Sequence, residues 1–376
     1  MARVTAVVAV VVVVVVVAPV PSTRLDPVAE VPVPEEHGSG GMRISNWGFP
    51  IIDFHAHFPV GDEHPPAAEE RYLQRHGERK ATILKENWRW YQEQWWSAYS
   101  FPFPEEEEPP PDVQARRWSD EIEAAQLEAV VFVTGGGNRL LADAIADQSR
   151  MFGFAHHDPF LPGAADELRR SVVEDGLSGY KVLAPALDGP LDDESLYGVW
   201  EVAEDLGIPV LIHFGTLDGG GGTAAHVNID PLVLHPVAKA FPEIPFVVPH
   251  FGCSYPGQLL QLAWACRNIH VDSSGNNEWI RWMPYPLTLT DLFAKFFDTV
   301  GPGRVLFGSD SSHFPRGLVR AYYDQQVQIV NELGLSADER HLVFAGNAAR
   351  LLGLSQVDVP GGSGAANAAE RGAGPA

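Results

Sequence analysis

The chain has 376 residues, 45% of them hydrophobic and 20% charged, which is enough to bury the core of one large globular domain. Its 26 Lys and Arg against 49 Asp and Glu give a net charge of −23, which argues against a nucleic-acid partner and against an anionic membrane surface. Two cysteines, Cys253 and Cys266, are too few for a disulfide framework or a cysteine-rich zinc site. The chain has 14 histidines, so a metal site is more readily built from histidine than from cysteine.

Both ends of the chain have compositions unlike a folded domain. Residues 6–18 contain only Ala and Val, fewer than the roughly 20 residues that span a bilayer. Two interpretations stay open: residues 1–22 are a signal peptide, or the segment lies upstream of a true start at Met42. In both cases we expect 1–41 to be outside the fold, 42–355 to form the domain, and 356–376 to be a disordered tail.

From residue 49 onward, short apolar runs alternate with helical patterns. The runs predict strands at Pro50–His57, Ala129–Thr134, Phe152–His156, Gly179–Leu183, Ile208–His213, Pro245–His250, Ile269–Asp272 and Arg304–Phe307. Helices are predicted at Ala165–Glu174, Asp193–Leu206, Pro231–Ala240, Gly257–Cys266, Leu287–Phe297 and Leu318–Leu333. Eight such units predict an α/β fold, the TIM (β/α)8 barrel. A doubly wound sheet is the alternative, but no Gly-rich phosphate loop follows the first strand.

The segment between the first two predicted strands is far longer than a plain crossover, which takes about a dozen residues. Its last part, Arg116–Leu127, is predicted to be the first barrel helix. Insertions after barrel strands lie over the active site, so we expect 62–112 to be a lid or a substrate wall. The alternative is a packing or dimer surface. The aromatic helix face on which this depends consists of Leu84, Trp88, Tyr91 and Trp95.

The strongest local motif is Asp53-Phe54-His55-Ala56-His57. Side chains alternate along a strand, so His55 and His57 point to the same side while Phe54 and Ala56 face the helices. Three more predicted strands end in, or are followed by, a ligand-type residue: His213, His250 and Asp310. Imidazole and carboxylate ligands without thiolates suit Zn²⁺, with Mn²⁺ or Fe²⁺ as alternatives.

Together these motifs resemble the amidohydrolase superfamily, in particular the amidohydrolase-related branch that includes aminocarboxymuconate-semialdehyde decarboxylase and the hydroxybenzoate decarboxylases. The resemblance covers roughly residues 49–355 and includes a closing helix at 346–352. It implies that one divalent ion is held by His55, His57, His213 and Asp310, and that His250 and Asp310 are catalytic.

Lys181 lies in the fourth predicted strand, where binuclear relatives carry a carboxylated lysine that bridges two metals. The favoured branch does not use this lysine as a ligand, so a single metal is expected. The loop after Asp310 departs from many relatives, which makes His313 a candidate substrate contact. The other candidate substrate contacts are Phe58, Trp88, Arg89, Lys181 and Asn276.

The resulting expectation is a hydrolase that uses a metal-activated water, with His and Asp as acid and base, on a small aromatic or carboxylated substrate. A non-oxidative decarboxylase of an aromatic or muconate-like acid is the alternative, since the same residues serve both reactions. A non-catalytic ligand-binding barrel is a third. The resemblance further implies a homodimer and a cytoplasmic protein, or an exported one if residues 1–22 are a signal peptide.

Overall fold

The computed structural model describes residues 42–58, 67–98, 100–134, 137–187, 189–215 and 226–354. The expected leader (1–41), the expected tail (356–376) and residues 62–66 of the expected insertion lie outside this description. Within the described part of the chain, no helix is both long and apolar enough to cross a membrane.

The strands coincide with the predicted apolar runs. They are β1 Ile52–His57, β2 Ala129–Thr134, β3 Met151–Gly153, β4 Ala155–His156, β5 Tyr180–Leu183, β6 Val210–His213, β7 Phe246–Val248, β8 Ile269–Asp272 and β9 Val305–Leu306. All paired strands are parallel and follow chain order. The short segments β3 and β4 are halves of one predicted strand: the Phe154 N–H bonds to β2, whereas the Ala155 N–H bonds to Gly179 before β5.

Backbone hydrogen bonds join the first strand to the segment after the last one and so close the sheet. Phe54 N–H donates to Phe307 O at 3.0 Å, and His57 N–H donates to Ser311 O at 2.8 Å. A parallel bridge also joins Ala56 to Ser311. Since β3 and β4 count as one strand, the closed sheet has the eight parallel strands of a TIM barrel, as predicted.

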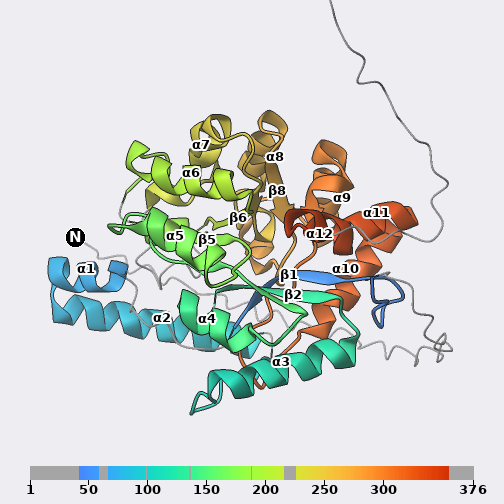
Figure 1. The fold of residues 1–376 in the computed structure, drawn as a ribbon, viewed down its shortest axis with the longest axis horizontal. Helices are drawn as coiled ribbons and strands as arrows, with labels where there is room; N and C mark the ends of the chain where they lie inside the picture. The colour runs from blue at the N-terminus through green and yellow to red at the C-terminus, as the bar shows by residue number, and fades with distance from the viewer. Residues whose placement is uncertain are drawn as a thin grey trace, which may run out of the picture. The chain divides into compact units, whose positions relative to one another are not determined.

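The helices follow the strands along the chain, and Figure 1 shows α5 to α9 outside them. They are α1 Ala67–His76, α2 Glu78–Ala98, α3 Pro111–Ala125, α4 Asn138–Ile145, α5 Ala164–Val173, α6 Tyr197–Leu206, α7 His235–Ala240, α8 Pro256–Ala265, α9 Leu289–Val300, α10 Arg320–Glu332, α11 Ala337–His341 and α12 Asn347–Leu351. The predicted helices are present with shifted ends; α7 is preceded by a 3₁₀ turn at Pro231–Leu234.

The core has two layers. A large outer cluster packs the helices on the strands, and a smaller inner one joins Ile52, Phe54, Leu211 and Val247. Strands β1 and β6 are not neighbours, so these residues meet across the barrel interior. The expectation that Phe54 faces the helices is therefore wrong. The β1–β2 register shifts between Asp53 and Ala56, and such a bulge interrupts the alternation of side chains.

The inserted segment contacts the loop that follows β9. Glu105 N–H donates to Phe314 O at 3.3 Å, His313 Nε2 lies 3.3 Å from Pro102 O, and the His313 ring is 5.8 Å from that of Trp96. This loop begins at Asp310, so the insertion packs against the segment that carries a predicted site residue. The lid function itself stays a prediction.

Candidate metal centre

Side chains from four strand ends meet at one end of the barrel. His57 Nε2 lies 2.9 Å from Asp310 Oδ1, and His55 Nε2 lies 3.7 Å from the same oxygen. The His250 ring centroid is 5.0 Å from that of His55 and 5.1 Å from that of His213. The fold therefore brings together all five residues predicted to form the site, because the carboxyl ends of parallel barrel strands share one rim.

The residues fit a divalent cation. Ligand atoms of His55, His250 and Asp310 all lie within 4.8 Å of one another. Nε2 of His55 is fully buried and makes no hydrogen bond within the described chain, which is costly unless an electron-pair acceptor meets it. Two imidazoles and a carboxylate suit Zn²⁺ or Mn²⁺. This group contains His250 in place of His57 and His213, so the division between ligands and catalytic histidine stays a prediction.

Asp272, the last residue of β8, orients His55. Its Oδ2 accepts a hydrogen bond from His55 Nδ1 at 2.6 Å, which leaves the Nε2 lone pair free to bind a metal. Burial raises the pKa of Asp272 to about 6. The site leaves no room for a side chain at Gly308, where a Cβ would lie 2.8 Å from both Asp272 Oδ1 and His55 Cβ. Sequence reasoning missed Asp272, although it too is a polar residue that ends an apolar run.

Replacing Asp272 with asparagine should weaken metal binding about 10- to 100-fold, because the amide no longer fixes the His55 tautomer as firmly. Competition with a chromogenic chelator measures this affinity. Saturating metal should restore most of the activity. The exposed Glu107→Gln serves as the control, and unchanged metal affinity in Asp272→Asn would show that the contact does not support the site.

Asp53 ties β1 to the loop that carries Asp310. Its carboxylate accepts hydrogen bonds from the Tyr323 hydroxyl at 2.6 Å, from Ser309 N–H at 2.9 Å and from the Ser309 hydroxyl. The Asp310 N–H in turn donates to His55 O at 2.8 Å. Asp310 itself adopts a left-handed backbone with φ 57°, which is uncommon for aspartate and is held by these bonds.

The Asp310 carboxylate is an anion in this setting. Burial alone would raise its pKa, but the hydrogen bond from His57 and the electrostatic interactions with the surrounding imidazoles hold it well below its usual range. The pKa of His55 is lowered by burial and then by the positive charge of Lys181. The centre is therefore preset with a negative carboxylate and a neutral imidazole, which are the protonation states that bind a metal.

His250 follows β7 in a strained turn. Its φ is 55° and that of Phe251 is 50°, both left-handed. Nδ1 of His250 contacts Ser274 O at 3.0 Å and Ser274 Oγ at 2.9 Å, and Trp279 Nε1 donates to the His250 carbonyl at 3.1 Å. These contacts fix the orientation of the His250 ring through Nδ1, so Nε2 is the nitrogen that can contact a metal or a substrate. Ser274 and Trp279 lie outside any motif that sequence reasoning singled out.

The predicted substrate contacts fall in different places. Lys181 points into the barrel, only 1% exposed, and burial lowers its pKa to about 8 while Asp272 and Asp310 raise it. His313 meets the inserted segment. Phe58 is 3% exposed and packs on Phe132 in the outer core. Arg89 is exposed on α2. The side chain of Trp88 lies outside the described residues, and Asn276 is considered below.

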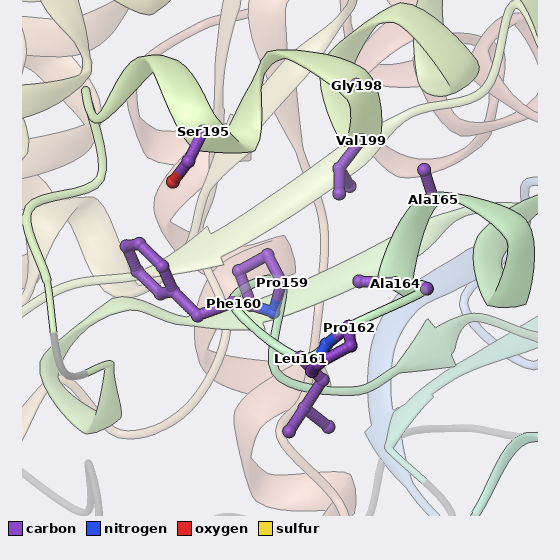
Figure 2. A pocket seen from close by; sticks show the side chains of 10 residues that line it. Pro159, Phe160, Leu161, Pro162, Ala164, Ala165, Ser195, Gly198 and Val199 are labelled. Carbon is purple, nitrogen blue, oxygen red and sulfur yellow. The ribbon is translucent and has the colours of Figure 1, made fainter.

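A pocket of about 320 Å³ lies between the segment after β4 and the start of α6 (Figure 2). It is lined mainly by apolar groups, among them Phe160, Leu161 and Val199, with Ser195 across from them. None of the metal-centre residues lines it, and it contains no titratable side chain. We assign it no part in the chemistry.

Among curated proteins, a 2-keto-4-carboxy-3-hexenedioate hydratase from a Sphingobium strain is 26% identical over 208 residues. The match covers 49% of this chain and 59% of the relative, so the chain spans less than two thirds of that protein.

Two solved structures share the fold at low sequence identity. One is a probable 2-pyrone-4,6-dicarboxylic acid hydrolase from Acinetobacter baumannii with citric acid bound, with a TM-score of 0.52 and 15% identity over 81% of this chain and 99% of that one. The other is a 5-carboxyvanillate decarboxylase from Novosphingobium aromaticivorans with bound manganese and a nitrobenzoic acid, with a TM-score of 0.51 and 16% identity over 82% and 98% of the two chains.

A family model described as amidohydrolase matches residues 52–354, which includes every strand and the whole metal centre. The chain therefore belongs to the amidohydrolase superfamily, in its amidohydrolase-related branch, and is an enzyme of that family.

Proposed function

We propose that the protein is a metal-dependent hydrolase acting on a small aromatic or carboxylated substrate. The observation that carries this is the convergence of His55, His57, His250 and Asp310 around a buried imidazole nitrogen that lacks a partner. We assign His55, His57, His213 and Asp310 as ligands of one divalent ion, with Zn²⁺ expected first and Mn²⁺ or Fe²⁺ as alternatives. Such an ion supplies Lewis-acid polarisation and lowers the pKa of water.

The acid–base work falls to Asp310 and His250. The Asp310 carboxylate is deprotonated and so can accept the proton of the attacking water and pass it to the leaving group. His250, whose Nδ1–H donates to the Ser274 carbonyl, has Nε2 available as an acceptor that orients the attacking water.

Decarboxylation of an aromatic or muconate-like acid is the second candidate. The buried cation of Lys181, which the charges of Asp272 and Asp310 favour, suits a substrate carboxylate near the centre. In that reaction His250 or Asp310 would deliver the proton that replaces carbon dioxide on carbon. The matched hydratase adds a third outcome, in which water adds across a carbon–carbon double bond.

One substrate screen separates these reactions. The metal-loaded protein is incubated with lactones and amides of aromatic acids, with hydroxybenzoic acids, and with unsaturated keto acids. Acid production in a pH-stat supports hydrolysis, released carbon dioxide supports decarboxylation, and loss of enone absorbance without either supports hydration. Turnover only in the second or third assay would contradict the hydrolase proposal. The homodimer and the cytoplasmic location stay predictions.

A further inference from the structure

A second cluster of polar side chains borders the metal centre. Arg316, in the loop after β9, donates from Nη1 to the Asp310 carbonyl oxygen at 3.2 Å and to Ser312 Oγ at 2.8 Å. Asn276 lies in the loop after β8, directly after Gly275. The Gly275 backbone passes so close to Asp310 that a Cβ added to this glycine would lie 3.2 Å from Asp310 Oδ2. Tyr322, on α10, is affected by the charge of Asp310. Arg316 and Tyr322 therefore lie near Asp310, and Asn276 follows a residue that packs against its carboxylate.

Two donors in this cluster lack an acceptor at normal hydrogen-bond geometry. The Tyr322 side chain is 7% exposed, and its hydroxyl makes no hydrogen bond of that geometry within the described residues. The Asn276 Nδ2 is likewise buried and unbonded, while its Oδ1 accepts from Glu278 N–H at 3.0 Å and so fixes the amide orientation. Leaving such donors buried without acceptors is costly, and native proteins rarely do so unless a ligand or a water fills the gap.

The pKa of Tyr322 reflects the groups that surround its hydroxyl. Burial raises the pKa of Tyr322 to about 12, whereas the charge of Arg316 and weak hydrogen-bond contacts from the Arg316 and Asn276 side chains lower it, so both side chains lie near the hydroxyl oxygen. Tyr322 is thus a neutral donor at physiological pH. The Asp310 carboxylate does not satisfy these donors: its Oδ1 faces His57 and His55, and neither donor is hydrogen-bonded to its Oδ2.

An aromatic ring from the inserted segment covers the cluster. Phe101 lies 4.2 Å from the Arg316 guanidinium carbon and packs edge-on to Tyr322 with ring centroids 6.3 Å apart. The cation–π contact with this ring holds the guanidinium in place. A cation, an amide and a hydroxyl under apolar cover form a site where an anion binds more strongly than in water.

We propose that Arg316, Tyr322 and Asn276 form a carboxylate-binding subsite beside the metal centre, so that the substrate carries a carboxylate besides its reacting group. The planar guanidinium and the two neutral donors match the in-plane oxygens of a carboxylate. This subsite deepens the proposed function and rests on it for the position of the reacting group. None of the three side chains is assigned to the reaction itself.

Calorimetric binding to the metal-loaded protein tests the subsite without turnover. The probes are isophthalate, which has two carboxylates, and 3-carbamoylbenzoate, in which a neutral amide replaces one of them. We expect isophthalate to bind about tenfold more tightly. Tyr322→Phe, which removes one oxygen atom, should lower this preference several-fold and leave binding of 3-carbamoylbenzoate unchanged. Asn276→Ala should act in the same direction, and Tyr285→Phe on an exposed tyrosine is the matched control.

Equal affinity for the two probes, no measurable isophthalate binding, or a preference that survives in Tyr322→Phe would overturn the subsite. Thermal unfolding of each variant verifies that the loop and α10 remain folded. The subsite and the proposed hydrolase activity can be refuted independently. If the protein prefers the dicarboxylate but hydrolyses nothing in the screen, the hydrolase proposal is refuted and the subsite is supported. If it hydrolyses a substrate but shows no preference for the dicarboxylate, the subsite is refuted and the hydrolase proposal is supported.

Discussion

Asp310→Asn is expected to lower kcat/KM about 10³-fold on the substrate that the screen identifies. The amide keeps the size and one acceptor oxygen of the carboxylate, so His57 retains a partner, but it has no basic site that can accept a proton at neutral pH. The low pKa of Asp310 shows that the fold stabilises the anion, and the variant loses that charge beside three histidines. Steady-state kinetics with metal content measured on the same sample gives the result.

Metal supplementation separates this variant from Asp272→Asn. Excess metal should restore Asp272→Asn, because its defect lies in the orientation of His55, and should leave Asp310→Asn inactive. Asp298→Asn, at an exposed position on α9, controls for the loss of one negative charge. If Asp310→Asn keeps more than about a tenth of the activity when fully loaded, Asp310 is not the group that moves the proton.

The convergence of the site could be predicted from sequence because the reasoning needed only strand order. Apolar runs that end in His213 or His250, or lead into Asp310, place those side chains at one rim once the strands are parallel and closed. No contact between distant residues had to be known. The same reasoning places Asp272, which ends β8, at this rim. Strand order alone does not distinguish a residue that binds a metal from one that hydrogen-bonds to His55, as Asp272 does.

The remaining features depend on contacts that alternation along a strand does not encode. The bulge in β1 turns Phe54 into the barrel, and no residue type at 53–56 marks it. The hydroxyl of Tyr322 belongs to a helix whose sequence pattern gives only its buried face. Its position beside Asn276 and Arg316 depends on two loops that pack together only in the folded chain.

His270, in β8, is expected to make the protein less stable in acid. It is 8% exposed, and burial together with the charges of Arg350 and Arg304 lowers its pKa to about 4, although contacts with the Asn268 and Phe246 backbones oppose this. In the unfolded chain this histidine has its ordinary pKa of about 6.5. Between pH 6.5 and 4 the unfolded chain therefore binds more protons than the folded chain. Stability is therefore lost as pH falls through that window, by about 3 kcal/mol.

Comparison with His270→Gln isolates this contribution, because the other groups that titrate in the window are present in both proteins. Two of them, Asp53 and Asp272, have pKa values raised to about 6 by burial and act in the opposite direction. Other histidines with lowered pKa values, such as His157, act in the same direction, so the acid loss of the wild type alone does not measure the effect of His270. Denaturant unfolding at several pH values should show the difference between wild type and variant shrinking or reversing toward pH 4. The exposed His235→Gln should keep the wild-type pH dependence. Parallel pH curves for wild type and His270→Gln would mean that the His270 imidazole is not held neutral by the fold.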